Sequence, residues 1–439
     1  QTIEWIMNIA TVPPGSSARF VSRLTRDTLA LILAGGRGSR LGTLTDWRAK
    51  PAVPFGARCR IIDFALSNCV HSQIRRIMVL TQYKSHSLVK HLLNGWGHLN
   101  SESGEFLDVV PAQQWVAEDA WYRGTADAVY QCMDIVAGYG PKYVLILAGD
   151  HIYAMDYGEM LAVHAETGAD VTIACTTVPI GEAHEFGIME VDAAGRIVGF
   201  EEKPKHPKPM PGRPDRALVS MGIYVFLTDY LAHQLRQDAS DDLSSKDFGK
   251  NIIPRLISQG YRVQAYYFGK PRSDEPEYWR DVGTVDAYFQ ANMELVSERP
   301  PLDLNAPAWP MMTYQPQLPP ARFVSSGTSC RVQNSIVANG TIVRSADIAQ
   351  SILSAKVSVE HGSVLERVVA LPGCEVRANC RLHNVILDNR CVVPEGTVIG
   401  EDPAADRARF EVTAGGTVVV TRKMLGQSAR YHPSLASGG

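Results

Sequence analysis

The chain has no long uninterrupted apolar stretch. No segment reaches the roughly 18 apolar residues typical of a membrane-spanning helix. The first 26 residues lack the basic start and unbroken apolar middle of an export signal, because Glu4 and Asn8 interrupt their one apolar patch. These absences favour a cytoplasmic protein with no membrane partner. The serines and arginines near the start leave an organelle-targeting segment as the alternative.

A strong net charge and paired metal-binding residues are also missing. The formal net charge is −3, which argues against a general nucleic-acid binder. The 8 cysteines form no Cys-x-x-Cys pair and lie mostly inside apolar runs, as buried thiols do in a reducing compartment. The 12 histidines show no spacing typical of a metal site. We therefore expect small anions as ligands and no structural zinc.

Patterns typical of strands and helices alternate through much of the chain, whose 45% hydrophobic and 20% charged residues are ordinary for a globular protein. Apolar runs predict strands at 29–33, 75–82, 142–150, 170–178, 219–226 and 261–269, with a hairpin at 188–204. Helical patterns lie between them, at 64–74, 85–96, 125–140, 156–168 and 248–260. This βαβ rhythm predicts a Rossmann-like, mostly parallel α/β domain over residues 27–296, after an N-terminal extension of residues 1–26.

The remainder of the chain has a different texture. Seven prolines between 297 and 323 predict a linker. Aliphatic residues then recur every sixth position, at Ile336, Ile342, Ile348, Val376, Leu382, Ile386, Val392 and Val398, with breaks in phase between the runs. This period is typical of a hexapeptide β-helix, in which such residues point into the stack. We predict a β-helix over 324–425 and a tail over 426–439; an irregular β-sandwich is the alternative.

Glycines and basic residues follow the first predicted strand. Gly35, Gly36 and Gly38 free the backbone to curve around a ligand, and 6 basic residues occur between positions 37 and 60 against one acid, Asp46. No Gly-Lys-Ser/Thr closes the loop and the third glycine of the dinucleotide fingerprint is absent, so it is neither a P-loop nor a dinucleotide-binding turn. A plain strand-to-helix turn is the alternative for the glycines alone. The basic residues indicate a polyanion.

The run AGGRGSRL…AKPAVPFG…RIIDF resembles the signature of the sugar-nucleotide pyrophosphorylases. Over about residues 27–425 the chain is similar to the bacterial branch of that family that forms ADP-glucose. The resemblance implies a nucleotidyltransferase domain followed by a left-handed parallel β-helix that serves regulation and oligomerisation, with a homotetramer as the assembly. It also implies Mg²⁺-dependent transfer of the adenylyl group of ATP to α-D-glucose 1-phosphate, as the regulated step of glycogen synthesis.

Asp150 ends the apolar run YVLILAGD. A carboxylate at the carboxyl end of a parallel strand lies where open α/β sheets bind ligands, and Mg²⁺ is usually held by one or two carboxylates plus phosphates. The resemblance supplies Asp281 as the second carboxylate, so both are predicted catalytic and metal-binding residues. The alternative for Asp150 is the N-cap of a following helix.

Two lysines precede prolines, Lys50-Pro51 and Lys203-Pro204, and the prolines bias both lysines toward an extended backbone. The resemblance places Lys203 on the phosphate of glucose 1-phosphate and Glu202 on the sugar hydroxyls. It adds three further residues to this substrate: Tyr122, Gly187 and Ser220. A solvated charge run is the alternative for the segment FEEKPK.

The resemblance also implies a nucleotide site and a regulatory site. The nucleotide site would use Arg40 and Lys50 on the triphosphate, where both are expected to be catalytic, Gln114 near the adenine, and the glycines Gly35, Gly36, Gly38 and Gly149. The regulatory residues would be Arg48, Arg60, Gln82 and Trp121. For the two arginines, solvation or pairing with surface acids is the alternative. Some relatives carry Lys and His where this chain has Trp47 and Pro54. The activator therefore stays open between a phosphorylated sugar and pyruvate, with AMP or phosphate as the inhibitor.

The sequence shows no Ser-His or His-Asp pair for nucleophilic catalysis, and an already ionised sugar phosphate needs no general base. Three alternatives remain. The first is a pyrophosphorylase that uses UTP, dTTP or GTP, and the second is a non-catalytic regulatory protein that binds nucleotide sugars. The third is an acyltransferase on the β-helix, for which His361 and His383 are the candidate bases.

Overall fold

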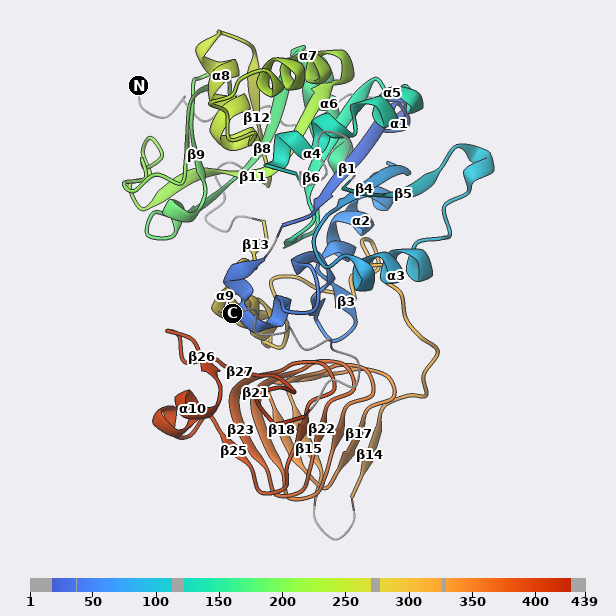
Figure 1. The fold of residues 1–439 in the computed structure, drawn as a ribbon, viewed down its shortest axis with the longest axis vertical. Coiled ribbons are helices and arrows are strands. Elements are labelled where there is room, and N and C mark those ends of the chain that lie inside the picture. Colours follow the sequence, from blue (N-terminus) through green and yellow to red (C-terminus); the bar gives the residue numbers. More distant parts are fainter. Residues whose placement is uncertain (1–17, 37, 113–121, 270–276, 326–328, 428–439) are drawn as a thin grey trace, which may run out of the picture. The chain divides into compact units, whose positions relative to one another are not determined.

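The computed structural model of the chain describes residues 18–36, 38–112, 122–269, 277–325 and 329–427 (Figure 1). Contacts divide the chain into two compact units. The first unit comprises 1–36, 64–85 and 96–279, and the second comprises 37–63, 86–95 and 280–439. This division differs from the predicted succession of extension, α/β domain, linker, β-helix and tail, whose bounds stay a prediction. No helix among the described residues is long and apolar enough to cross a membrane.

The first unit is built on a nine-stranded sheet with the order β10-β9-β11-β6-β1-β4-β5, in which β8 pairs with β11 and β12. Its strands are β1 (Thr28–Ala34), β4 (Arg76–Thr81), β5 (Phe106–Pro111), β6 (Tyr143–Ala148), β8 (Val171–Pro179), β9 (Gly187–Val191), β10 (Ile197–Glu202), β11 (Arg216–Leu227) and β12 (Val263–Tyr267). The pairs β6-β1, β1-β4, β4-β5 and β8-β12 are parallel, whereas β11 runs antiparallel to β6, β8 and β9. The prediction of a mostly parallel sheet is confirmed.

The central strand β1 shows why these residues form a sheet. Its sequence TLALILA is apolar throughout, and nearly every residue is buried. Leu29 and Leu31 pack into the main hydrophobic core with residues of α4, α5, α7 and α8, while Ala30 and Ile32, also buried, point to the opposite face. Full burial of a leucine side chain stabilises the fold by about 1.5 to 3 kcal/mol. A run that is apolar at every position therefore belongs in a sheet covered on both faces.

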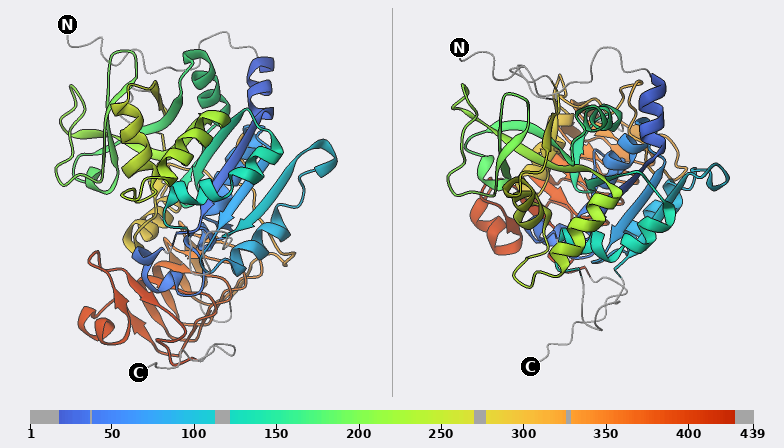
Figure 2. Two further views of the ribbon diagram at one scale, coloured as in Figure 1. Left: turned by 45° about the horizontal axis from the view of Figure 1, so that its top comes forward. Right: turned by 90° about the horizontal axis from the view of Figure 1, so that it is seen from above.

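Helices lie on both faces of this sheet (Figure 2). The helices of the first unit are α1 (Ala18–Arg26), α2 (Ile62–His71, which begins in the second unit), α4 (Thr125–Gln131), α5 (Met133–Tyr139), α6 (Tyr157–Thr167), α7 (Thr228–Ala239) and α8 (Ile253–Ser258). Shorter elements are the 3₁₀ turns η4 (Ser101–Ser103) and η5 (Ala183–Glu185), the π-turn η6 (Phe248–Ile252) and the strand β7 (His151–Tyr153). The single helix predicted over 125–140 is wrong in one respect, because it divides at Cys132 into α4 and α5.

The second unit contains the predicted β-helix, a coil of short parallel strands (Figure 1). Its strands are β14 (Arg322–Val324), β15 (Arg331–Gln333), β16 (Ile336–Val337), β17 (Ile342–Arg344), β18 (Asp347–Ala349), β19 (Ile352–Leu353), β20 (Ser358–Val359), β21 (Val364–Ala370), β22 (Glu375–Val376), β23 (Arg381–Leu387), β24 (Val392–Val393), β25 (Val398–Ile399), β26 (Glu411–Val412) and β27 (Val418–Val420). The helix α10 (Pro403–Arg409) lies between β25 and β26, and β26 differs from the other strands because it runs antiparallel to its partner β27. The predicted left-handed sense of the coil stays a prediction.

The register explains the breaks in the six-residue pattern. Ile336 pairs with Ile352, 16 residues later, whereas Val364 pairs with Arg381 and Arg381 with Val398, each 17 residues later, so the turns are one or two residues short of three hexapeptides. Of the predicted core residues, Ile348, Val376, Leu382 and Ile386 are buried. Ile336, Ile342, Val392 and Val398 are only partly buried, and their prediction as core residues is wrong. For Ile342, Val392 and Val398, the following residue is buried instead. These buried residues are Val343, Val393 and Ile399.

The basic segment after the glycine loop also belongs to the second unit. It forms the 3₁₀ turns η2 (Ser39–Thr45) and η3 (Lys50–Ala52) and a small hairpin of β2 (Pro54–Phe55) and β3 (Cys59–Arg60). The helices α3 (His86–Gly95) and α9 (Val285–Leu295) complete this part, and the chain passes between the units within β13 (Trp279–Asp281). Asn292 of α9 accepts a hydrogen bond from the Gly56 N–H at 3.1 Å, and Thr43 Oγ1 donates to Glu411 at 2.9 Å. We call residues 38–63 the basic arm.

Candidate active site

In the second unit, three predicted catalytic residues lie together. The Lys50 Nζ is 2.9 Å from the Asp281 Oδ1, and the Arg40 Nη2 is 3.8 Å from the Asp281 Oδ2. Lys50 is only 6% exposed, whereas 47% of the Arg40 side chain is exposed. Asp281 thus holds one buried and one exposed cation, and the group has an excess positive charge that suits a polyphosphate.

The predicted extended backbone at Lys50 is wrong. Lys50 begins the 3₁₀ turn η3, and its carbonyl accepts a hydrogen bond from the Val53 N–H at 3.0 Å. Gly38 packs on the lysine, since a Cβ at position 38 would lie 3.1 Å from the Lys50 Cβ. Gly38 also has φ +63, which favours glycine. The turn's hydrogen bond outweighs the local preference of a residue before proline.

In the first unit, three glycines follow or flank the ends of parallel strands. Gly35 and Gly36 follow β1, and Gly149 follows β6, which is paired with β1. The Gly149 N–H donates to the Leu33 carbonyl at 3.1 Å, and a Cβ on Gly149 would lie 3.0 Å from that oxygen. A Cβ on Gly36 would meet no atom within 4 Å. Gly36 therefore leaves room beside the backbone at the edge where open α/β sheets bind ligands. The predicted Gln114 and Trp121 lie outside the described residues.

Asp150 occupies a turn between β6 and β7. The strand β7 follows it directly and Asp156 caps the next helix, so the alternative role of Asp150 as an N-cap is excluded. Its side chain is 34% exposed, and the His151 Nε2 lies 3.6 Å from its Oδ1. The His151 ring packs edge-on against Trp279, with 5.1 Å between ring centroids. A partly exposed carboxylate at the carboxyl end of β6 has the donor atoms and the access that Mg²⁺ requires. Asp281, the second predicted metal ligand, belongs to the second unit.

The residues predicted for glucose 1-phosphate include a paired set on the β9–β10 hairpin. Gly187 begins β9 and pairs with Glu202 at the end of β10. A Cβ on Gly187 would lie 2.8 Å from the Glu202 Oε2, so a larger residue would displace this carboxylate. The Glu202 pKa is raised overall. Burial is the largest cause, the Lys203 charge opposes it, and the Asp247 charge adds to it. Glu202 is therefore held in a partly dehydrated position, as a hydrogen-bond acceptor for sugar hydroxyls would be.

Lys203 also departs from the predicted extended backbone, which is wrong here too. Its φ is +51, a left-handed conformation that costs a non-glycine residue energy. The Lys203 N–H donates to the Phe186 carbonyl at 3.0 Å, which fixes this turn after the hairpin. Its side chain is half exposed, and its ammonium lies 4.0 Å from the Glu202 Oε1. Backbone strain of this kind is often found where a side chain must be aimed at a ligand.

Tyr122 and Ser220 lie on other elements of the first unit. The Tyr122 carbonyl accepts a hydrogen bond from the Gln82 Nε2 at 3.5 Å, and its hydroxyl is 3.7 Å from the Cys132 Sγ. Burial raises the Tyr122 pKa well above its usual range, so the phenol stays protonated and can donate. Ser220 lies on β11, and its hydroxyl accepts from the Gly222 N–H at 3.2 Å.

Residues 246–250 lie against one member of this set, Glu202, and none of them was predicted from the sequence. A Cβ on Gly249 would lie 2.7 Å from the Glu202 Oε2 and 3.5 Å from the Asp247 Oδ1. Asp247 caps η6 by accepting a hydrogen bond from the Lys250 N–H at 3.1 Å. The charges in KDFGK at 246–250, at the start of the helix predicted over 248–260, were the available signal.

The predicted regulatory arginines have partners within the second unit. Arg48 is buried, forms an ion pair with Asp388 and donates to the Asn389 Oδ1 at 3.2 Å. Arg60 donates to the Ala52 carbonyl at 3.2 Å and to the Ser87 carbonyl at 3.0 Å. Burial, together with the nearby Arg48 charge, lowers the Arg60 pKa to about 10. An anionic effector would therefore have to compete with existing contacts. Gln82 lies in the first unit, against Gly35.

Comparisons with known proteins cover both units. A family profile described as nucleotidyl transferase matches residues 29–298, and one described as GlmU-like, C-terminal hexapeptide matches residues 319–420. The glucose-1-phosphate adenylyltransferase of Nitrosococcus oceani is 55% identical over 417 residues, which are 94% of this chain and 98% of the relative. Glucose-1-phosphate adenylyltransferase 1 of Alkalilimnicola ehrlichii is 56% identical over 94% of this chain and 98% of the relative. The glucose-1-phosphate adenylyltransferase of Shewanella sp. strain ANA-3 is 53% identical over 95% of this chain and all of the relative.

Proposed function

The chain belongs to the glucose-1-phosphate adenylyltransferase family, and from this premise we propose which residues perform each part of the reaction. The enzyme transfers the adenylyl group of ATP to α-D-glucose 1-phosphate and releases pyrophosphate, which gives ADP-glucose for glycogen synthesis. The observation that carries this conclusion is the 55% identity over 94% of the chain and 98% of a relative with that name.

The triphosphate of ATP is assigned to the glycine loop and the basic arm. Gly35, Gly36 and Gly38 would offer backbone N–H groups, and Gly149 would keep the neighbouring turn close to β1. Arg40 and Lys50 would neutralise phosphate oxygens. The 2.9 Å contact between Lys50 and Asp281 supports this role, because it orients the ammonium before substrate binds. Gln114 is proposed for the adenine edge.

Glucose 1-phosphate is assigned to the first unit. Lys203 would bind the phosphate and Glu202 the sugar hydroxyls, while Tyr122, Gly187 and Ser220 would complete the site. The pairing of Gly187 with Glu202 and the left-handed backbone at Lys203 support this assignment, since both fix where the charged groups point.

Nucleotidyltransferases use a divalent metal ion, and we assign Mg²⁺ to the carboxylates of Asp150 and Asp281. The ion would neutralise charge that develops on the transferred phosphorus and the leaving pyrophosphate. The phosphate oxygen of glucose 1-phosphate attacks the α-phosphorus of ATP, and the bond to the β-phosphate oxygen breaks. The attacking oxygen is already ionised at neutral pH, so the protein contributes alignment and charge neutralisation and moves no proton.

Regulation and assembly complete the proposal. Arg48 and Arg60, with Gln82 and Trp121, are assigned to an effector site that binds a phosphorylated sugar or pyruvate as activator. AMP or phosphate would oppose activation. The assembly is proposed to be a homotetramer.

The test is incubation of the purified enzyme with glucose 1-phosphate, Mg²⁺ and each nucleoside triphosphate in turn, with pyrophosphate release as the readout. ATP should give the highest kcat/KM. A preference for UTP, dTTP or GTP would contradict the adenylyl assignment. No pyrophosphate with any nucleotide, from protein that binds ADP-glucose, would show a non-catalytic protein.

A further inference from the structure

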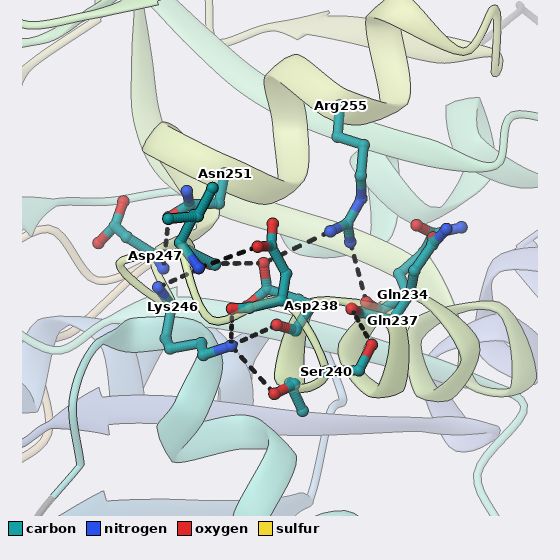
Figure 3. Close-up of polar contacts among 12 residues, drawn as sticks. Gln234, Gln237, Asp238, Ser240, Lys246, Asp247, Asn251 and Arg255 are labelled. Carbon is teal, nitrogen blue, oxygen red and sulfur yellow. Dashed lines mark hydrogen bonds and ion pairs between the residues drawn. The ribbon is translucent and has the colours of Figure 1, made fainter.

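A buried lysine ammonium sits in a cage of backbone carbonyls in the first unit (Figure 3). The Lys246 Nζ donates to the carbonyls of Asp238, Ala239 at 3.1 Å and Asp241 at 2.6 Å. Lys246 is only 3% exposed. The three acceptors belong to the last turn of α7 and the residues just after it, where helical carbonyls lack intrahelical partners. The ammonium therefore uses all three of its N–H groups to close the carboxyl end of this helix.

This arrangement is unusual because no carboxylate in the described part of the chain forms an ion pair with the lysine. The nearby Asp238 carboxylate instead accepts from the Ser244 hydroxyl at 2.8 Å and lies 3.5 Å from the Arg255 Nη1. A buried ammonium costs energy unless it is fully hydrogen-bonded, and three charge-assisted bonds together with the negative end of the α7 dipole offset that cost. The side chain thus fastens the loop of residues 240–247 to the end of α7.

The backbone of the same lysine supports a second element. The Lys246 carbonyl accepts a hydrogen bond from the Ala126 N–H at 2.9 Å, at the start of α4. Gly124 packs directly on this carbonyl, since a Cβ at position 124 would lie 2.2 Å from the oxygen. Tyr122, one of the residues assigned to glucose 1-phosphate, is two positions earlier in the chain. The backbone at Lys246 has φ +59, so the turn is held in a conformation that a lysine rarely adopts alone.

The residue after the lysine extends the connection to the other side of the sugar-phosphate residues. The Asp247 Oδ2 accepts from the Thr125 hydroxyl at 3.1 Å, and its Oδ1 caps η6. Gly249, within η6, is the residue whose missing side chain makes room for the Glu202 carboxylate. One ammonium thereby fixes a loop that touches both the segment after Tyr122 and the carboxylate of Glu202.

We propose that Lys246 is a positioning residue for glucose 1-phosphate, acting through its carbonyl cage on the loop that aligns Tyr122 and Glu202. This inference rests on the assignment of those two residues to the sugar phosphate. Lys246 itself touches no substrate. Its loss should weaken capture of glucose 1-phosphate and leave ATP binding almost unchanged, because the ATP residues lie on other elements.

The test compares Lys246→Met with Arg255→Met in steady-state kinetics and thermal unfolding. Methionine keeps the length of the lysine side chain without its charge or donors. Arg255 is the matched control, since it also contacts α7, where it donates to the Gln234 carbonyl at 2.9 Å and lies 3.5 Å from the Asp238 carboxylate (Figure 3). The atoms that a Cβ on Gly124 or Gly249 would meet first belong to other residues. We expect Lys246→Met to raise the KM for glucose 1-phosphate by about tenfold with an ATP KM within about twofold of wild type. Arg255→Met should lower the Tm without this KM change.

A second variant tests the cage itself. In Lys246→Ala, ethylammonium added to the buffer can bind to the three carbonyls in place of the lysine ammonium. It should lower the KM for glucose 1-phosphate most of the way back to the wild-type value, whereas ethanol should not. The inference is overturned if Lys246→Met lowers the Tm as Arg255→Met does without a selective rise in this KM, or if both KM values rise equally.

Lys203→Ala distinguishes a failure of the Lys246 role from a failure of the proposed glucose 1-phosphate site. If it raises the KM for glucose 1-phosphate and Lys246→Met does not, only the Lys246 role fails; if Lys203→Ala leaves that KM unchanged, the site assignment fails and the Lys246 role fails with it.

Discussion

Lys50 and Asp281 face each other at 2.9 Å, and this ion pair sets the expected result of removing the lysine. Lys50→Ala should lower kcat by roughly 10² to 10³, as seen when one preorganised donor at a developing charge is lost. The KM for glucose 1-phosphate should change little. The measurement is steady-state kinetics with each substrate varied, with Lys208→Ala as the control because Lys208 is an exposed lysine paired with Glu190. A change confined to the sugar-phosphate KM would mean that the roles of Lys50 and Lys203 are exchanged.

Asp150 offers the clearest separation of binding from chemistry. Asp150→Asn keeps the shape of the side chain and removes the charge that would hold the metal ion. We expect kcat to collapse while the binding of glucose 1-phosphate, measured by calorimetry, changes much less, because a metal ligand acts mainly in the transition state. The affinity of the free enzyme for Mn²⁺, followed by electron paramagnetic resonance, should also fall. A variant with near wild-type kcat would remove Asp150 from the mechanism.

At the scale of elements, α6 carries a buried histidine that should make stability depend on pH. His164 lies 2.9 Å from the Thr172 hydroxyl of β8, and burial lowers its pKa from 6.5 to about 4. The unfolded chain therefore binds a proton between pH 6.5 and pH 4 that the folded protein does not, so this histidine lowers stability as the pH falls through that window. By pH 5 the loss is about 2 kcal/mol.

His164→Gln, which cannot titrate, should show a smaller difference in urea midpoint between pH 7.5 and pH 5 than wild type. His184→Gln is a suitable control, because about half of the His184 side chain is exposed. An unchanged pH dependence in His164→Gln would mean that other groups govern acid unfolding.

The elements also show which parts of the fold could be predicted from the sequence. Strands such as β1 and β6 were predictable because a buried parallel strand is apolar at every position. The amphipathic α7 was missed because more than half of its residues are polar and no proline or glycine marks its ends. The backbones of Lys50 and Lys203 were predicted wrongly because hydrogen bonds to Val53 and Phe186 outweigh the local effect of proline.

The candidate site was predictable to a similar degree. Motif residues such as Asp150 and Glu202 could be named from the chain, since their neighbours in sequence form a recognisable pattern. Lys246 could not, because its partners are backbone carbonyls of three residues and only the fold brings them to one point. Every residue has a backbone carbonyl, so such a partner cannot be recognised from the sequence.

For the whole molecule, the β-helix bears on the proposed tetramer. Its surface exposes Phe323 on β14 and Val364 on β21, which are 50% and 43% exposed, and β14 lies at the edge of its sheet. Exposed apolar residues on an unpaired strand edge are typical of a surface that another chain covers. We expect multi-angle light scattering to give about four times the 48.1 kDa of one chain. A monomer at micromolar concentration would contradict the assembly, and Phe323→Asp should shift the equilibrium toward smaller species.

The proposed regulation would use the basic arm and the β-helix together. Arg48 is bound to Asp388, between β23 and β24, and lies two positions from Lys50. An anionic effector that takes Arg48 must displace the Asp388 carboxylate, and the resulting shift of the arm would change the pose of Lys50. Asp388→Asn removes the competing charge, so it should lower the activator concentration for half-maximal effect, with coupling of about 1 to 3 kcal/mol in the wild type.

The measurement is a panel of fructose 1,6-bisphosphate, fructose 6-phosphate, pyruvate and AMP against wild type, Arg48→Ala, Arg60→Ala and Asp388→Asn. Arg48→Ala and Arg60→Ala should respond weakly to whichever metabolite activates the wild type, while Asp388→Asn responds at lower concentration. Arg48 has a carboxylate partner when no effector is bound, so an activator has to displace that partner. The activating effect should therefore vary more with the charge of the effector than with its shape. A wild type that responds to none of the four, or arginine variants that respond like wild type, would mean that the Arg48–Asp388 pair serves stability alone.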